Sequence, residues 1–101
     1  MLLNAENSAA YVGLGEVFDE SEDSQSAISN YESALKIDPG LTDVSSPLGI
    51  LYYQTGDVPK ADALLKKALL TEQDDPQTYY FLGLVKLSQE NFKEAETAFR
   101  K

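Results

Sequence analysis

The sequence predicts an all-α fold, a solenoid of repeated helix-turn-helix units, on three observations. The pair Leu-Gly recurs every 34 residues, at Leu14-Gly15, Leu48-Gly49 and Leu82-Gly83. An alanine recurs with the same period, at Ala27, Ala61 and Ala95. Within each unit the apolar residues are three and four positions apart, which is the period of a helix and not of a strand. Units of this length cannot bury their apolar faces alone, so we expect them to stack on one another.

The first unit, residues 8–41, reads as two helices separated by the polar run DESEDSQ (19–25). The apolar positions of its first helix are Tyr11, Leu14, Gly15 and Phe18, and those of its second are Ala27, Ile28, Tyr31, Ala34 and Leu35. Asp38-Pro39-Gly40 is predicted to end the second helix, because proline cannot continue a helix and glycine allows a left-handed exit. The residues before this unit, 1–7, read as the end of a preceding helix or an N-terminal extension.

The second unit, residues 42–75, contains a proline where its first helix should begin. A proline inside a helix costs about 3 kcal/mol, so we predict a late start with Ser46 as the N-cap and Pro47 in the first turn. That start would shorten the helix and open the groove wall near residues 42–46. Asp57 is predicted to cap the second helix, with Pro59 in its first turn. The run Asp74-Asp75-Pro76 is predicted to end that helix and to cap the next one.

The third unit, residues 76–101, reaches Lys101 within its own second helix. Solenoids usually end in a polar capping helix, and none follows here. We therefore expect either an excerpt of a longer array or an assembly in which another chain caps this end.

The recurring small residues have a steric explanation. A glycine or alanine at one point of each helix lets its partner helix approach closely, and large neighbours then fill the flanking grooves. Leu14 with Tyr31, and Leu82 with Phe99, are the residues predicted to do so.

Composition excludes several kinds of chemistry. The chain has no cysteine and no histidine, so it can build neither a disulfide nor a Ser-His-Asp or Cys-His catalytic arrangement. The acidic cluster at 19–23 lacks the glycine and the spacing of an EF-hand loop. We expect no catalysis, no cofactor and no metal. No signal peptide or membrane-spanning run is visible, which leaves the compartment unknown and favours the cytoplasm.

The net charge of −9 argues against nucleic acid and against an anionic membrane, since both are bound through Lys and Arg. The charge is also uneven. Residues 1–41 carry −7, residues 42–75 carry −3, and residues 76–101 carry +1. Two interpretations stay open: a solvated surface, or steering of a basic partner toward the N-terminal half.

The spacing resembles the tetratricopeptide repeat, a 34-residue helix-turn-helix unit. The first unit matches its pattern at Tyr11, Leu14, Gly15, Phe18, Ala27, Tyr31, Ala34 and Pro39. The other units match at fewer positions: Ser45 replaces the first aromatic in the second unit, and Lys86 replaces the second aromatic in the third. The resemblance implies a right-handed superhelix of about three units, the last one incomplete, with a concave groove that binds a peptide or helix.

On this resemblance, the chain is predicted to be a non-catalytic scaffold for protein–protein interaction. The residues expected to line the groove are Ile50, Tyr53, Tyr80, Phe81, Leu84 and Leu87 as apolar contacts, with Glu16, Asp19 and Glu20 selecting a basic flank. Family members that bind the acidic tails of heat-shock chaperones use a clamp of basic and amide residues. Its positions here are Val12, Glu16, Pro47, Gln77 and Phe81, none of them Lys, Arg or Asn, so a chaperone tail is not expected.

Three alternative interpretations remain. The apolar third unit and the open C-terminal end could pack against another copy, which would make the chain a homo-oligomer. The chain could also be the recognition segment of a larger enzyme. The apolar groove residues could equally pack against one another and the next helix.

Overall fold

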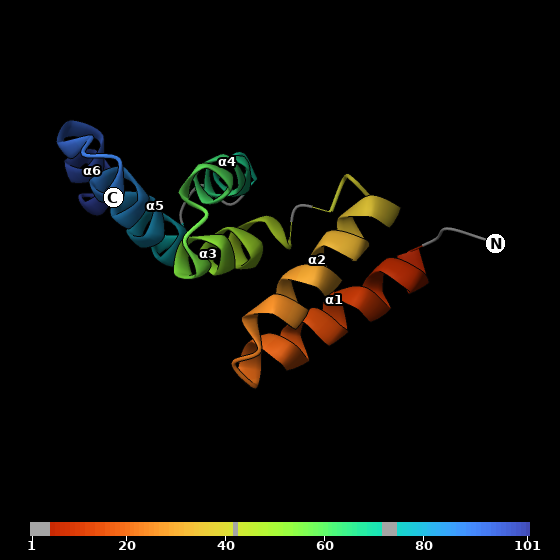
Figure 1. The fold of residues 1–101 in the computed structure, drawn as a ribbon. Helices are drawn as coiled ribbons and strands as arrows, with labels where there is room; N and C mark the ends of the chain where they lie inside the picture. Colours follow the sequence, from red (N-terminus) through yellow and green to blue (C-terminus); the bar gives the residue numbers. More distant parts are fainter. Residues whose placement is uncertain (1–4, 42, 72–74) are drawn as a thin grey trace. The chain divides into compact units, whose positions relative to one another are not determined.

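A computed structural model describes residues 5–41, 43–71 and 75–101, and within these ranges it contains six α-helices and no strand (Figure 1). The chain divides into two compact units, residues 1–44 and 45–101. The first unit holds α1 (Ala5–Glu20) and α2 (Ser24–Ile37). The second unit holds α3 (Ser45–Thr55), α4 (Val58–Leu69), α5 (Pro76–Ser88) and α6 (Phe92–Phe99). The all-α prediction is confirmed.

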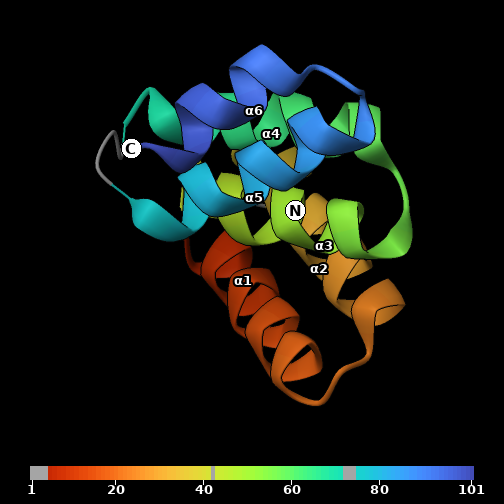
Figure 2. The same ribbon diagram turned by 90° about the vertical axis from the view of Figure 1, so that its left-hand side faces the viewer.

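In the first unit, α1 and α2 form a helical hairpin (Figure 2). A Cβ atom added at Gly15 would lie 2.7 Å from a ring carbon of Tyr31. The aromatic ring therefore occupies the space that any other residue at this position would need. Tyr31, Ala27 and Ala34 are buried along this contact, which confirms the predicted close approach of the two helices.

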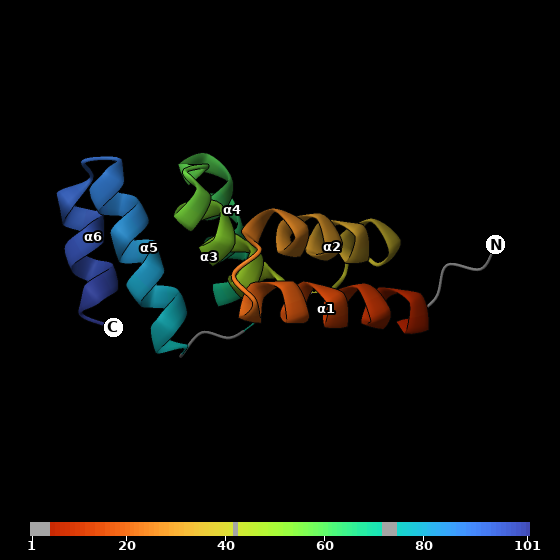
Figure 3. The same ribbon diagram turned by 60° about the horizontal axis from the view of Figure 1, so that its bottom comes forward.

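The second unit repeats the arrangement twice (Figure 3). A Cβ atom at Gly49 would lie 3.0 Å from the Leu65 side chain of α4, and one at Gly83 would lie 2.5 Å from the Phe99 ring of α6. These partners, like Tyr31, are 34 residues apart in the sequence. In addition, α5 packs on α4 and on α3, so the two hairpins of this unit form one body.

The turns inside the three hairpins share one backbone conformation. Glu22, Gly56 and Glu90 occupy the same repeat position, and all have a positive φ, of 64°, 98° and 58°. The following residues, Asp23, Asp57 and Asn91, each donate a backbone N–H to a carbonyl five residues earlier, at 2.8 Å in every case. Such a bond together with a left-handed residue is a Schellman helix ending.

The same three residues also cap the next helix. The side-chain oxygens of Asp23, Asp57 and Asn91 accept hydrogen bonds from the backbone N–H three residues later, at 3.2, 3.3 and 3.4 Å. The prediction for Asp57 and Pro59 is confirmed. Each turn therefore ends one helix and starts the next within three residues, and this fixes the geometry of the hairpin.

Several predicted boundaries need correction. Residues 5–7 form the start of α1 and do not end a preceding helix; residues 1–4 lie outside the described part. Ser46 is not an N-cap, because α3 already begins at Ser45. Its hydroxyl instead lies 2.8 Å from that of Thr78 on α5. Relative to the repeat, α3 still starts three residues later than α5, with Pro47 in its first turn, as predicted.

The ends of the second helices are confirmed in one unit and corrected in the other. Helix α2 ends at Ile37, directly before Asp38-Pro39-Gly40, as predicted. Helix α4 ends at Leu69, well before the predicted terminator. Of that terminator, residue 74 lies outside the described residues, as does residue 42 of the predicted groove opening. Asp75 caps α5 through a bond of 3.1 Å from the N–H of Gln77.

Candidate functional site

The second unit brings together two of the predicted groove residues. Tyr53 on α3 and Phe81 on α5 meet edge to face, with ring centroids 6.0 Å apart and planes at 65°. Both side chains are half-buried, as are Ile50 and Leu84 on the same two helices. Part of each of these apolar side chains is therefore still accessible to solvent, and a partner could cover it.

Aromatic contacts extend beyond the predicted set. The Tyr80 ring lies 5.3 Å from that of Phe81 and 5.9 Å from that of Phe99 on α6, so four rings run from α3 to α6. Tyr80 and Phe99 are 53% and 42% exposed. Phe99 was predicted only as a filler inside its hairpin. Its equivalents Tyr31 and Leu65 are buried, so the repeat pattern held no signal for this exposure.

Tyr80 and Leu87 differ from the other predicted apolar groove residues in being exposed and not half-buried. Their repeat equivalents are Ser46 and Tyr53, which contact Thr78 and Phe81 of the following hairpin. At these two repeat positions, the hairpin α3–α4 therefore contacts the hairpin α5–α6. Leu87 is 42% exposed.

The predicted acidic residues lie on α1, in the first unit. Glu16, Asp19 and Glu20 are all exposed, and Glu16 and Glu20 border a shallow hollow of about 650 Å³ together with Gly13 and Val17. Partial desolvation, and then the negative charge of Glu20, raise the pKa of Asp19 above its ordinary value. A cation placed beside these carboxylates would be attracted.

The same acidic residues act on Tyr31 of α2. Burial of the ring, and after it the negative charges of Asp19 and Glu16, raise the pKa of Tyr31 to about 12. A neutral phenol beside these carboxylates avoids a third negative charge.

A second apolar surface of the first unit was not predicted as exposed. Tyr11 and Leu14 are 37% and 45% exposed, although the sequence pattern assigned them to the interior. They line a hollow of about 660 Å³ between α1 and α2, with Asn7, Ala10, Ser33, Lys36 and Ile37. Val17, one turn further along α1, is 61% exposed.

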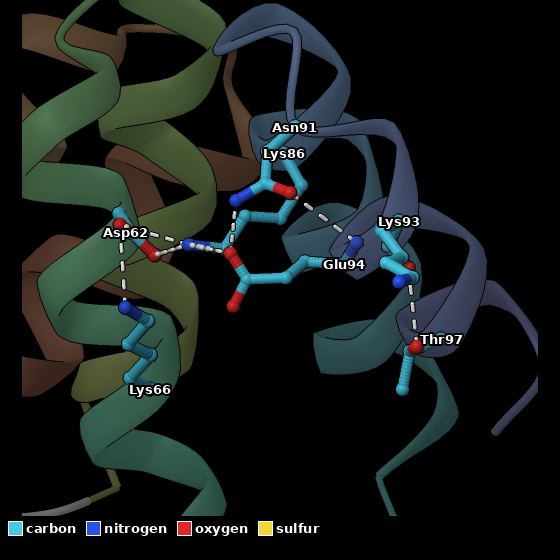
Figure 4. Close-up of polar contacts among 7 residues, drawn as sticks. All are labelled: Asp62, Lys66, Lys86, Asn91, Lys93, Glu94 and Thr97. Carbon is cyan, nitrogen blue, oxygen red and sulfur yellow. Dashed lines mark hydrogen bonds and ion pairs between the residues drawn. The ribbon is translucent and has the colours of Figure 1, made fainter.

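The second unit also contains a buried ion pair, centred on Lys86 (Figure 4). Lys86 is only 5% exposed, and its Nζ lies 3.2 Å from Asp62 of α4 and 3.9 Å from Glu94 of α6. Asp62 is also 3.5 Å from Lys66, and Asn91 donates a hydrogen bond to Glu94. From its sequence Lys86 was identified only as the residue that replaces an aromatic. The ion pair joins α5 to both neighbouring helices.

Among the described residues, no group of three or more carboxylates is arranged to hold a metal ion. No helix in the described ranges combines the length and the apolar character needed to cross a bilayer.

Comparison with known proteins also identifies a helical repeat in this chain. The profile of a family described as "Tetratricopeptide repeat" matches residues 20–85, and a second profile with the same description matches residues 76–101. Among curated relatives, the BBSome complex member bbs-4 of Caenorhabditis elegans is 30% identical over 88 residues, which are 87% of this chain and 18% of that protein. The CTR9 homolog of Arabidopsis thaliana is 30% identical over 97 residues, 90% of this chain and 9% of that protein. The chain thus spans less than a fifth of either relative.

Solved structures share the fold. The first tetratricopeptide domain of Spaghetti (RPAP3), bound to the HSP90 peptide SRMEEVD, matches with a TM-score of 0.84 at 13% identity, over 96% of this chain and 77% of that one. MamA matches with a TM-score of 0.82 at 23% identity, over 93% and 55%. A second MamA structure matches with a TM-score of 0.81 at 26% identity, over 94% and 52%. The helical-repeat prediction is confirmed.

Proposed function

The chain belongs to the tetratricopeptide repeat family, and from this we propose that it is a non-catalytic scaffold whose second unit binds a segment of another protein across α3 and α5. The observation that carries the proposal is the half-buried apolar surface of Ile50, Tyr53, Phe81 and Leu84. Aromatic and aliphatic side chains of this kind anchor helices and extended peptides in grooves. The Tyr80 ring contacts those of Phe81 and Phe99 and continues this surface toward α6, and the exposed Leu87 of α5 is proposed as a further apolar contact.

The partner we propose carries basic residues as well as apolar anchors. Residues 1–41 carry −7 of the net charge of −9, and Glu16, Asp19 and Glu20 present carboxylates to solvent. An exposed acidic surface raises the association rate of a basic partner, and salt weakens that effect. The SRMEEVD peptide of the structural neighbour is acidic at its end, and the clamp positions of this chain, which include Glu16 and Phe81, are unsuited to such a ligand.

A displayed library of random peptides, selected against the 101-residue chain, tests the proposal. We expect enriched peptides to combine two or more large apolar residues with Lys or Arg. A synthetic peptide of the enriched sequence is then titrated by fluorescence anisotropy. Leu84→Glu should weaken its binding at least about tenfold, because the substitution places a charge on the apolar surface.

The matched control is Leu70→Glu, at a 76% exposed leucine that lies outside this surface. It should bind the peptide as the wild type does. Enrichment of acidic peptides, or equal loss in both variants, would overturn the proposal. Circular dichroism on both variants separates loss of binding from loss of fold.

A further inference from the structure

Three polar side chains of the second unit form a hydrogen-bonded chain from α5 to α3. The Oδ2 atom of Asp75, the N-cap of α5, accepts a hydrogen bond from the Thr78 hydroxyl at 2.6 Å. The Thr78 hydroxyl also lies 2.8 Å from the hydroxyl of Ser46 on α3. Thr78 is fully buried, whereas Ser46 is half-buried. The hydrogen bonds therefore connect a buried hydroxyl to one that is partly accessible to solvent.

The direction of these hydrogen bonds follows from the chemistry of Asp75. A carboxylate has no proton to donate, so the single hydroxyl proton of Thr78 is used in the bond to Asp75. The Thr78 oxygen is then only an acceptor, and the Ser46 hydroxyl is the donor of the second bond. Because the Ser46 proton is used in this way, Ser46 Oγ offers only lone pairs to any further partner. The negative charge of Asp75 polarises both bonds, which strengthens Ser46 Oγ as an acceptor.

Ser46 lies at one end of the apolar surface to which we assign binding of a protein segment. It precedes Ile50 by four residues and Tyr53 by seven on α3, so the three share one face of the helix. All three are half-buried, and the Tyr53 ring contacts that of Phe81 on α5. A segment that covers these apolar side chains would therefore lie within one helical turn of Ser46 Oγ.

The repeat does not require polar residues at these positions. The three polar residues have apolar equivalents 34 positions earlier, at Val12, Leu41 and Val44. Val44 is buried, as is its equivalent Thr78. Since apolar residues occupy the same repeat positions elsewhere in the chain, packing of the helices does not by itself account for the polar chain in the second unit.

We propose that Ser46 is a specificity-determining residue of this surface, and that its oxygen accepts a hydrogen bond from an N–H donor side chain of the partner: Lys, Arg or Trp. The inference rests on the proposed binding of a protein segment across α3 and α5. It adds that the partner carries a donor at the one position that lies over Ser46. A carboxylate at that position is disfavoured, because its lone pairs would face those of Ser46 Oγ.

Parallel selections from the displayed random-peptide library, against the wild type and three variants of equal net charge, test the proposal. Wild type should enrich peptides that place Lys, Arg or Trp at a fixed spacing from the apolar residues. Ser46→Ala should keep the apolar residues and lose the preference at that one position. Thr78→Val removes the acceptor of the Ser46 proton, so Asp and Glu should then be tolerated there. Ser29→Ala, at an exposed site on α2, is the control and should select as the wild type does.

Asp75→Asn should reverse the preference. The amide oxygen would take the place of Oδ1, which accepts from the Gln77 N–H at 3.1 Å, so the amide N–H group would donate to Thr78. Thr78 would then donate to Ser46, and the Ser46 proton would be free for the partner. Asp or Glu should therefore be enriched where the wild type enriches a donor. Asp57→Asn removes the same charge at the N-cap of α4 and should leave the preference unchanged.

Fluorescence anisotropy with a synthetic peptide of the enriched sequence measures the size of the effect. Replacing its donor residue by an analogue without an N–H group, norleucine for Lys or Arg and benzothienylalanine for Trp, should weaken binding to the wild type about fivefold more than binding to Ser46→Ala. Equal weakening in the two proteins, or unchanged selection by Ser46→Ala, would overturn this inference and leave the scaffold function standing. A library that yields no peptide with paired apolar residues would overturn both.

Discussion

The hairpins α1–α2 and α5–α6 are built on the same contact and differ in what surrounds it. In both, a glycine of the first helix lies against an aromatic ring of the second, Gly15 against Tyr31 and Gly83 against Phe99. Tyr31 is 2% exposed, but Phe99 is 42% exposed. Behind the contact, α1 carries a half-buried Phe18 where α5 carries the buried Lys86. The contact between the glycine and the ring is thus the same in both hairpins, whereas the solvent exposure of the ring and the residue behind the contact differ.

The largest difference to test is the buried ion pair between Lys86 and Asp62 in the second unit. Lys86→Ala would leave Asp62 partly buried with only the exposed Lys66 as a partner, and we expect a loss of about 2–3 kcal/mol in the free energy of unfolding. Urea denaturation followed by circular dichroism measures it. Lys66→Ala removes a solvent-exposed partner of the same carboxylate and should cost less than about 1 kcal/mol.

The double variant Asp62→Leu/Lys86→Phe sharpens this comparison, because it gives α5 the aromatic that α1 has at Phe18. Replacing both members of a buried pair by apolar residues is often neutral or stabilising, so its stability should be close to the wild type. A double variant as unstable as Lys86→Ala would show that the frame of this hairpin requires charge at position 86.

The second comparison adds one methyl group to each hairpin. In Gly15→Ala the new Cβ meets the Tyr31 ring, which is buried and cannot move away, so we expect a loss of about 2 kcal/mol from overpacking. In Gly83→Ala the Phe99 ring can turn outward, and alanine is a better helix former by about 1 kcal/mol. The net change there should be within about 1 kcal/mol of zero. Gly13→Ala, which meets nothing, is the control and should be stabilising. Equal losses at positions 15 and 83 would contradict the different mobility of the two rings.

The smallest effect is a pH dependence confined to the first unit. Because burial raises the pKa of Tyr31 to about 12, the folded state keeps a proton that the unfolded state loses near 10. Stability from this group is therefore complete below pH 10 and is lost as the pH rises from 10 to 12, by roughly 1–2 kcal/mol. Denaturation at several alkaline pH values should show a steeper decline in wild type than in Tyr31→Phe. Parallel declines would argue against the raised pKa.

Much of the fold could be predicted from the sequence. The 34-residue period, the helix pairs and the glycine contacts all follow from residues with one strong steric role, such as Gly15 and Tyr31. The cap at Asp57 was predicted because Val58-Pro59 marks a helix start. The equivalent caps at Asp23 and Asn91 were missed, since their signal lies in the repeat position and not in the local residues.

The surfaces were harder to predict than the frame. Leu14, Tyr11 and Phe99 occupy interior positions of the repeat pattern, and their exposure depends on what packs outside the hairpin, which a local pattern does not encode. The pairing of Lys86 with Asp62 depends on two residues from different hairpins. The predicted groove residues Ile50, Tyr53, Phe81 and Leu84 lie on neighbouring helices of one unit, but their use by a partner stays a prediction.

The three left-handed turn residues have a consequence for how such a chain can change length. Glu22, Gly56 and Glu90 are separated by equal intervals and share one backbone conformation. A duplication or deletion of 34 codons that begins at any of them joins one such turn to another, and every helix remains whole. Recombination within the gene at these codons would lengthen or shorten the protein by a complete hairpin in a single event. No intermediate gene would encode an incomplete hairpin.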